Sequence, residues 1–287
     1  MLLATLAGGI SLGFLYGLVA LTLILLVRTT GVLNFAAAEV GMLCAFITFT
    51  ALTQFHLPAL VAVLLTLVFS ALLGAAVYCG IVLIRPADPL TLSLRTLGLL
   101  LIVNSVAYKI WGANSPYTFP NILPHGFVTL FGFNVGYVQL LVIAFAILIS
   151  LAVWVLTERT KLGLLLRAVS SDREAAADLG VPVISVDLMA WCLATTVACC
   201  VGILVAHLFF LAPDMMAPIL LAGFAAAQLG EMKSARIALV AGVALGIIQS
   251  ASSVYFNQPE LSQILSFLVL TVGLIVRGKL HDRVVST

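Results

Sequence analysis

Nine long runs of apolar residues divide the chain, and a short polar stretch separates each run from the next. A membrane-spanning helix needs about 20 mostly apolar residues, so each run predicts one span. The run at 216–232 is short, and a re-entrant pair of half-helices is the alternative there. The predicted spans are 3–27, 32–53, 59–84, 92–111, 137–157, 183–210, 216–232, 237–256 and 260–276.

The composition agrees with this pattern. Hydrophobic residues make up 63% of the 287 positions and charged residues 8%, with a mean hydropathy of +1.25. Soluble domains carry about 25% charged residues, so the sequence predicts an all-α polytopic membrane protein, a bundle of eight or nine spanning helices forming one transmembrane domain over 1–287. No basic residue precedes the first apolar run. This is unlike a cleavable signal peptide, and we expect the run to remain a span.

Lysine and arginine are distributed unequally between the two sides that alternate along such a chain. Cytoplasmic loops of membrane proteins are enriched in these residues, so we place the most charged loop, 158–182, in the cytoplasm. Twelve Lys and Arg then lie on the cytoplasmic side, and Lys109 alone lies outside. The N-terminus is predicted outside and the C-terminus in the cytoplasm. The segment 112–136, rich in proline and aromatic residues, is predicted to be an outer, interfacial loop.

The loop 158–182 also contains the pattern of a short helix with stops at both ends. Ser171 and Glu174 predict a capping box, in which the Ser171 hydroxyl closes the first turn and Glu174 reaches back. Gly180 predicts a left-handed C-terminal stop, and Pro182 prevents the helix from continuing. The result is a helix of about eight residues, roughly 12 Å long. A helix of this size could be a docking element for another protein. The alternative is an ordinary loop helix exposed to solvent.

Four polar residues inside predicted spans are candidates for a translocation path. Glu39 is ionisable and costly in a membrane unless it is solvated or paired, so it either lines a path or serves as a hydrogen-bonded strut between helices. For Asn104, a bond to a neighbouring carbonyl is favoured over a place in the path lining. The path candidates are Asn34, Glu39, Asn104 and Gln228.

Residues 34–41 read NFAAAEVG and residues 223–230 read GFAAAQLG, which are identical at five of eight positions. In the predicted topology these two copies run in opposite directions, as in the inverted repeats of transporters. We therefore hypothesise that Glu39 and Gln228 are pseudo-symmetric partners near an axis. Chance similarity between alanine-rich helices is the alternative.

Two spans carry small residues at four-residue spacing, which lets helices approach closely in lipid. We favour packing within this chain over an interface between subunits. These small residues are Gly9, Gly13 and Gly17 in the first span and Gly242, Gly246 and Ser250 in the eighth.

The five cysteines lie in apolar runs and are interpreted as buried packing thiols.

The pattern EAA-x-x-x-G, which begins at Glu174 and ends at Gly180, resembles the coupling loop of ABC importer permeases. The residues around it make it most similar to permeases of the branched-chain amino acid uptake family. In that family this loop docks into a groove on a separate ATPase subunit. The coupling candidates are therefore Arg167, Ser171, Asp172, Glu174, Ala175, Ala176 and Gly180.

The resemblance extends to the second span, where the family carries the stretch Asn-Phe-Ala-His-Gly-Glu. This chain keeps its first three residues and Glu39 but has Ala37 and Ala38 in place of the His and Gly. Residues 230–235 also lack the paired glycines and the Pro-Gly turn that the family usually shows. Both departures bear on the substrate.

The resemblance implies the permease subunit of an ATP-driven importer for branched-chain or related amino acids in the bacterial inner membrane. It implies two ATPase subunits, a second homologous permease subunit that is identical or different, and a periplasmic or extracellular solute-binding protein. Segment 112–136 would then be a landing surface for that binding protein. Urea, short amides or another small polar solute would suit the same scaffold.

Sequence signals for several kinds of chemistry are missing. The chain has no G-x-x-x-x-G-K-[ST] loop, no Cys/His cluster with metal spacing and no G-x-S-x-G or H-E-x-x-H motif. We expect no enzyme activity, no cofactor or metal and no nucleic-acid partner, with ATP hydrolysed on separate chains. A proton- or sodium-coupled carrier is the rival of a different class, and only Glu39 could serve it. A channel is a further alternative, without a recognisable selectivity filter.

Overall fold

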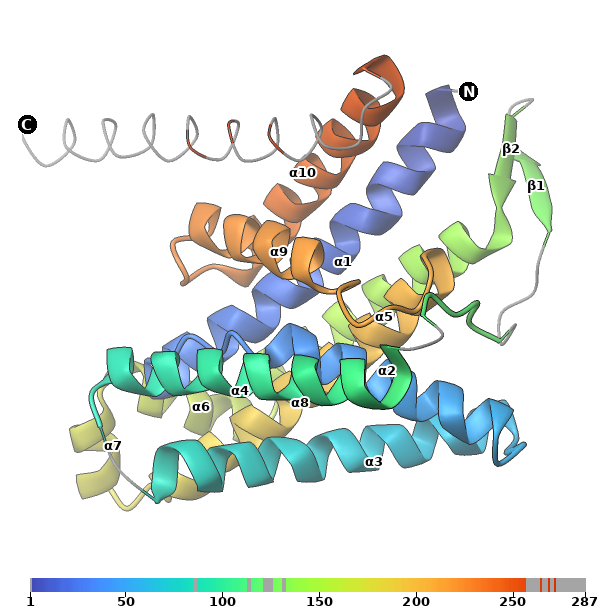
Figure 1. Ribbon diagram of the computed structural model, residues 1–287. Coiled ribbons are helices and arrows are strands. Elements are labelled where there is room, and N and C mark those ends of the chain that lie inside the picture. Colours follow the sequence, from blue (N-terminus) through green and yellow to red (C-terminus); the bar gives the residue numbers. More distant parts are fainter. Residues whose placement is uncertain are drawn as a thin grey trace, which may run out of the picture.

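A computed structural model describes residues 2–84, 87–112, 115–120, 126–130 and 133–256, together with positions 264, 268 and 271. This part of the chain contains ten α-helices, a π-helical segment η1 (Tyr78–Leu83) that continues α3, and a hairpin of β1 (Phe127–Leu130) and β2 (Phe133–Gly136) (Figure 1). The helices are α1 (Leu2–Thr30), α2 (Ala37–Thr53), α3 (Ala59–Val77), α4 (Pro89–Trp111), α5 (Tyr137–Arg159), α6 (Lys161–Ser171), α7 (Arg173–Asp178), α8 (Val183–Leu208), α9 (Ala217–Leu229) and α10 (Ala235–Phe256).

Six described helices are long and apolar enough to cross a membrane: α1, α3 with η1, α4, α5, α8 and α10. Helices α2 and α9 are apolar but have only 17 and 13 residues, fewer than the roughly 20 of a full span. The predicted spans 32–53 and 216–232 are therefore too long, and α9 is one short helix rather than two half-helices. The predicted span 260–276 lies outside the described residues apart from three positions.

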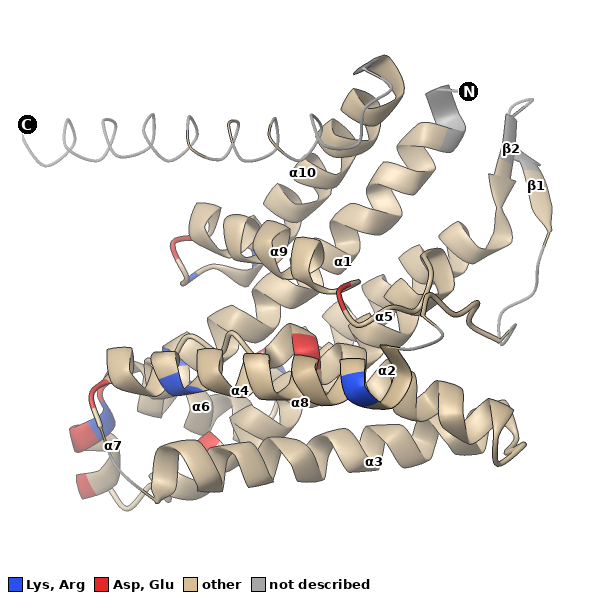
Figure 2. Cartoon of the chain, in the orientation of Figure 1, with Lys and Arg blue, Asp and Glu red and all other residues tan. Residues whose placement is uncertain are grey.

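Charged residues gather at one end of the bundle, around α7 and the turn between α9 and α10 (Figure 2). Lys109 is near the opposite end of α4, and it is the exception among the described basic residues. This segregation is the one expected from the predicted topology. The basic residues at the charged end are Arg28, Arg95, Arg159, Lys161, Arg167, Arg173, Lys233 and Arg236.

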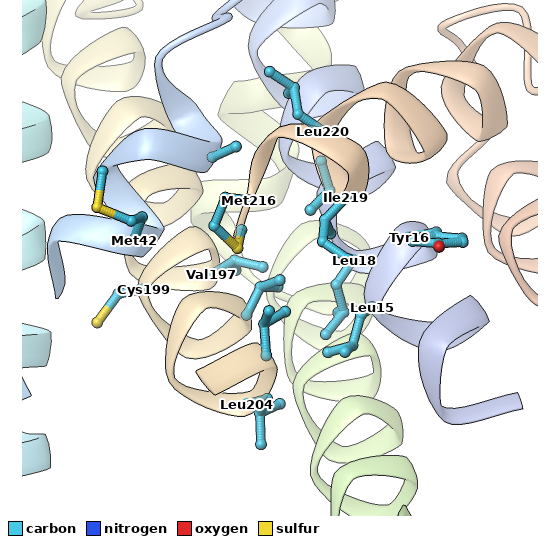
Figure 3. Packing of buried hydrophobic residues seen from close by; sticks show 14 of the residues in the cluster. Leu15, Tyr16, Leu18, Met42, Val197, Cys199, Leu204, Met216, Ile219 and Leu220 are labelled. Atoms are coloured by element: carbon cyan, nitrogen blue, oxygen red, sulfur yellow. The ribbon is translucent and has the colours of Figure 1, made fainter. Parts of the chain in front are cut away.

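The main core forms where α1, α2, α8 and α9 meet. Figure 3 shows Leu15 and Leu18 of α1 close to Ile219 of α9, and all three are buried. The five cysteines are free, and Cys44 and Cys199 are buried in this core. The interpretation as buried packing thiols is confirmed for these two, whereas Cys79, Cys192 and Cys200 are only partly buried.

Helices α1 and α8 are the central helices of the bundle. Helix α1 packs against α9 and α10, and α8 packs against α2 and α3. Helix α1 ends at the charged end, where α8 begins, so the two run in opposite directions. This reciprocal packing is what an inverted repeat relating α1–α3 to α8–α10 predicts.

The small-residue faces of α1 and α10 pack against each other within the chain. A Cβ atom added to Gly13 would lie 2.5 Å from the Cα atom of Val243, and one added to Gly246 would lie 2.4 Å from the backbone nitrogen of Gly13. The backbones are therefore in contact, which confirms the prediction of packing within the chain. Helices α2 and α8 cross in the same way, since a Cβ atom on Gly202 would lie 2.0 Å from the Gly41 carbonyl oxygen.

The segment between α4 and α5 is more structured than a plain interfacial loop. Strands β1 and β2 pair antiparallel and are, in the described part of the chain, the one departure from the predicted all-α fold. Tyr117 exchanges two backbone hydrogen bonds of 2.9 Å with Leu211 in the connection between α8 and α9, and Phe119 is buried. Backbone pairing and aromatic packing thus hold this segment on the bundle, and neither is visible in the hydrophobic pattern.

Candidate functional site

The loop between α5 and α8 folds into two helices, of which the second, α7, is the predicted coupling helix. Its N-cap is Asp172, whose Oδ1 atom accepts hydrogen bonds from the backbone N–H groups of Glu174 and Ala175, both at 3.0 Å. The predicted capping box is therefore wrong at its first residue, because Ser171 is the last residue of α6. A carboxylate in this position satisfies two N–H groups and also meets the positive end of the helix dipole.

The C-terminal stop of α7 is confirmed. Gly180 has a φ of +82°, and its N–H donates to the Ala177 carbonyl at 2.9 Å while the Val181 N–H donates to the Ala176 carbonyl at 3.0 Å. This bonding pattern is a Schellman motif. The helix has six residues, Arg173–Asp178, rather than about eight.

Helix α7 presents almost all of its surface outward. Glu174 and Ala175 are exposed, whereas Ala176 is buried against the bundle. Just after the helix, Leu179 leaves 85% of its surface exposed, an apolar side chain that the sequence analysis did not single out. A small, charged projection with an exposed leucine at its tip is suited to docking with another protein.

Arg167 faces the bundle as well as solvent. Its Nη1 atom donates to the Thr157 carbonyl at 2.7 Å and pairs with the Glu158 carboxylate at 2.9 Å. Helix α6 also lies against the end of α5 at Gly163, where an added Cβ atom would be 2.0 Å from the Thr157 carbonyl oxygen. The predicted coupling residue Arg167 therefore ties α6 to α5.

Arg173 joins α7 to both central helices. It donates to the Thr29 carbonyl in the last turn of α1 at 3.0 Å and to the Asp187 carboxylate in the first turns of α8, at 3.2 Å to Oδ1 and more closely to Oδ2. The Asp187 side chain has no exposed surface. Tyr78 of η1 donates to it from the other side at 3.4 Å, so α1, α7, α8 and the π-helical segment meet at one buried carboxylate.

Sequence reasoning missed this cluster. The signal that could have found it is Asp187 itself, a carboxylate inside the predicted span 183–210 that needs a partner for the same reason as Glu39. The partner, Arg173, lies in the coupling loop, where its charge was counted only toward the orientation of the chain.

The predicted path residue Asn34 lies in irregular backbone between α1 and α2. Its Oδ1 atom accepts from the backbone N–H of Ala36 at 3.1 Å, which starts α2 later than the apolar run suggests. Side chains of α4 satisfy the neighbouring backbone: Ser93 accepts from the Leu33 N–H at 3.0 Å, and Thr96 accepts from the Phe35 N–H at 3.1 Å. Non-helical backbone within a membrane protein is tolerated where protein groups satisfy it in this way.

Glu39 and Asn104 are brought together. The Asn104 amide donates to the Glu39 carboxylate at 3.3 Å and to the Pro213 carbonyl at 2.9 Å, which confirms the favoured carbonyl bond of Asn104. Glu39 is buried in the first turn of α2, where the helix dipole favours a carboxylate. Helix α4 thus bonds the irregular segments that precede both short helices, 31–36 before α2 and 209–216 before α9.

Gln228 is not part of this group. It lies half-buried in the last turn of α9, whereas Glu39 lies in the first turn of α2, so the two are not counterparts by position. The repeated motifs do meet through Phe35 and Phe224, whose ring centroids are 6.3 Å apart.

Within the described residues, no three His, Cys, Asp or Glu side chains gather in a group that could hold a metal ion. A multi-pass helical bundle with irregular segments beside its short helices and an exposed, doubly stopped helix at its charged end has the architecture of a membrane permease. The chain belongs to the family described as "Branched-chain amino acid transport system / permease component", which matches residues 5–274. It is the transmembrane permease component of an ABC transporter and is not itself catalytic, and the family implies ATPase and binding-protein partners.

Relatives extend over most of the chain. The "Probable branched-chain amino acid transport permease protein LivH" of Methanocaldococcus jannaschii is 27% identical over 261 residues, covering 87% of this chain and 81% of that protein. The "High-affinity branched-chain amino acid transport system permease protein BraD" of Pseudomonas aeruginosa is 23% identical over 291 residues, covering 96% and 94%. The fold matches a chain of "PsaBC from Streptococcus pneumoniae in complex with Fab" with a TM-score of 0.53 and 12% identity, covering 96% of this chain and 89% of that chain.

Proposed function

We propose that this chain is the membrane-spanning permease subunit of an ATP-driven importer for branched-chain or related amino acids. It works in the bacterial inner membrane with its N-terminus outside and its C-terminus in the cytoplasm. Its partners are two ATPase subunits, a second homologous permease subunit and an outer solute-binding protein. The observation that carries this proposal is the exposed helix α7, bonded to both central helices through Arg173.

In this mechanism an ATPase subunit grips α7 at its exposed residues, Glu174 and Leu179. Movement of α7 reaches α8 through the Asp187 carboxylate and α1 through the Thr29 carbonyl. Hydrogen bonds to charged groups contribute about 1.5–3 kcal/mol, and these contacts link α7 directly to α1 and α8. Because α1 and α8 are central, a displacement at this point is passed to the helices packed on both.

The solute path runs beside α4 in this proposal. Glu39 and Asn104 are the polar pair on that route, and they lie where α4 bonds the segment before α9. Irregular backbone next to short helices is typical of solute sites in transporters. A solute that takes part in the switching cycle binds the outward and inward states with different affinity.

Branched-chain amino acids are the first substrates to test, because the family and the named relatives are amino acid permeases. The named relatives are 23–27% identical, and Ala37 and Ala38 place no polar side chain at the two positions directly before Glu39. Urea, short amides or another small polar solute is the second candidate for the same scaffold.

ATP-driven uptake of leucine into cells that express the whole transporter tests the coupling role. The variants Glu174→Ala, Leu179→Asp and Gly180→Val change the exposed helix or its left-handed stop. We expect each to lower uptake about tenfold, the effect of losing roughly 1.4 kcal/mol of docking free energy, with unchanged amounts of protein in the membrane. Lys109→Gln at the opposite end is the control. Full uptake in all three variants would contradict the proposal.

The rival carrier mechanism makes the opposite prediction in the same cells. Uptake that survives loss of the ATPase genes but collapses with the proton gradient would favour an ion-coupled carrier that uses Glu39. We expect uptake to stop without the ATPase.

A further inference from the structure

A cleft of about 490 Å³ opens at the charged end of the bundle, beside the coupling loop. Its walls are the C-terminal half of α1, the end of α5, the face of α6 and the start of α10. The inner wall is apolar and includes Leu21, Ile24, Val153 and Leu239. Along α1 the lining runs from Leu21 to Thr29, about 12 Å at 1.5 Å per residue.

The rim of this cleft is basic. Arg28 from the end of α1, Lys233 from the turn after α9 and Arg236 from the start of α10 all line it and are all exposed. In the described part of the chain these three side chains have no acidic partner. The fourth cation of the lining, Arg167, is paired with Glu158. The cleft therefore combines an apolar interior with an excess of positive charge at its mouth.

A buried polar atom marks the interior. The Ser150 hydroxyl lines the cleft, is inaccessible to solvent and has no hydrogen-bond partner among the described residues. Helical hydroxyls commonly bond the carbonyl four residues earlier, as Thr157 does to Val153 on the same helix. An unpaired buried hydroxyl costs free energy, so an occupant with a polar atom at this depth would satisfy it.

The surroundings indicate where the occupant comes from. The outer faces of α5 and α10 next to the cleft are apolar and exposed, at Leu151 and Trp154 on α5 and at Ile237 and Val240 on α10. In a membrane these faces contact acyl chains. Trp154, which lines the cleft, has the Arg159 guanidinium 5.6 Å from its ring centroid, a pairing suited to the headgroup level. The cleft is thus open to the bilayer at the level where lipid phosphates lie.

We propose that this cleft binds an anionic phospholipid of the bilayer. The lipid phosphate contacts Arg28, Lys233 and Arg236. The part of the acyl chains next to the headgroup lies along the apolar walls of α1 and α10, and an ester oxygen accepts a hydrogen bond from Ser150. Basic pockets between helices on the cytoplasmic side bind anionic lipid headgroups in other membrane proteins. Here the lipid joins α1 and α10 to the α5–α6 corner that carries the coupling loop.

The test is lipid retention by the full-length chain purified together with its partner subunits. The delipidated complex is titrated with phosphatidylglycerol or with phosphatidylcholine, and bound lipid is counted by native mass spectrometry. The double variant Arg28→Gln/Arg236→Gln removes two rim charges. We expect it to bind phosphatidylglycerol about 30-fold more weakly, because each of the two cations contributes about 1 kcal/mol near an anionic headgroup and every 1.4 kcal/mol is a factor of ten. Ser150→Ala should weaken binding less.

The matched control is Lys161→Gln, which removes a basic residue of the same end that does not line the cleft, and it is compared with the single rim variant Arg236→Gln. The control should keep the wild-type affinity. A second variant, Leu239→Trp, fills the inner wall without changing charge and should lower retention. A lipid-binding loss in the control as large as in the rim variant would overturn the proposal, because it would show only a basic membrane surface.

Two further outcomes would also overturn it. Displacement of phosphatidylglycerol by inorganic phosphate at equal concentration would mean that the site takes a free anion. Equal retention of phosphatidylcholine would mean that the rim charges do not select an anionic lipid. No lipid retention in the assembled complex would mean that a partner subunit covers the cleft.

Discussion

Asp187 is a buried carboxylate of α8 whose partners come from α7 and η1. Its carboxylate is fully buried and depends on donors from Arg173 and Tyr78. Arg173→Gln leaves it with weaker partners. We expect the free energy of unfolding to fall by about 2 kcal/mol, the typical value of a hydrogen bond to a charged group, since the Arg173 side chain is itself 48% exposed.

A double-mutant cycle with Asp187→Asn measures this pair. The double variant should lose less stability than the sum of the two single variants, because each single change already breaks the same contact. Thermal unfolding in nanodiscs is the measurement, and Lys161→Gln, an exposed change on α6, is the control. Additive losses would show that the pair contributes no coupling.

Asn104 serves two acceptors with one amide group. Asn104→Leu leaves the buried Glu39 carboxylate and the Pro213 carbonyl without this donor, and an unsatisfied buried group costs about 1–3 kcal/mol. We expect a lower melting temperature and lower uptake. Glu39→Gln can still accept from Asn104 and should keep stability, so reduced uptake in that variant would separate a path role from a strut role. Unchanged stability in Asn104→Leu would contradict the contact.

At the scale of single residues, the sequence showed which buried polar side chains need hydrogen-bond partners, but it did not show which residues are those partners. Glu39 and Asn104 both stand out as polar positions in apolar runs. Their contact joins positions 65 apart, and no local pattern encodes such a separation. Asp187 is also a polar position in an apolar run. It was overlooked because its partner, Arg173, lies in a loop whose charged residues were expected to face water.

Among the elements, α1 and α10 have the most extensive described packing against each other. Gly246→Val places a branched side chain where an added Cβ atom would already lie 2.4 Å from the backbone nitrogen of Gly13. Overpacking of this kind costs about 1–3 kcal/mol or more, so we expect α1 and α10 to separate and the yield of folded protein to fall.

The matched control is Gly98→Ala in α4, where an added Cβ atom meets nothing within 4 Å. Replacing a helical glycine in open space removes its entropic cost of about 0.5–1 kcal/mol, so stability should be unchanged or slightly higher. Thermal unfolding in nanodiscs compares the two variants. Equal stability of both would contradict close α1–α10 packing.

The elements were predictable where local chemistry defines them. The stop of α7 follows from Gly180 alone, because its φ of +82° is unfavourable for other residues. The start was misplaced because Ser171 and Asp172 are both good N-caps. The sequence does not show that the preceding helix, α6, extends through Ser171 and leaves Asp172 as the N-cap. The lengths of α2 and α9 were overestimated because the irregular segments before them are as apolar as the helices.

For the whole molecule, the motifs led us to hypothesise an inverted repeat, and the register that they suggest differs from the observed packing. The motif alignment pairs Gly41 with Gly230. In the fold, Gly41 packs on α8 at Ala198, and the glycine of α9 that packs on α1 is Gly223, at Val19. Counterparts defined by packing are therefore seven residues away from those defined by sequence identity. Alanine-rich helices match one another in several registers, whereas close backbone contacts allow one.

The segregation of charge makes the orientation of the whole chain testable by labelling. Thr118 is exposed in the segment after α4, and Asp178 is exposed at the end of α7, so Thr118→Cys and Asp178→Cys report opposite ends. With a membrane-impermeant maleimide we expect Thr118→Cys to react in intact cells and Asp178→Cys to react only after the membrane is broken. The parent chain, whose five native cysteines lie in α2, η1 and α8, gives the background. The reversed pattern would place α7 outside, where no ATPase could reach it, and the coupling role of Arg173 would fall with it.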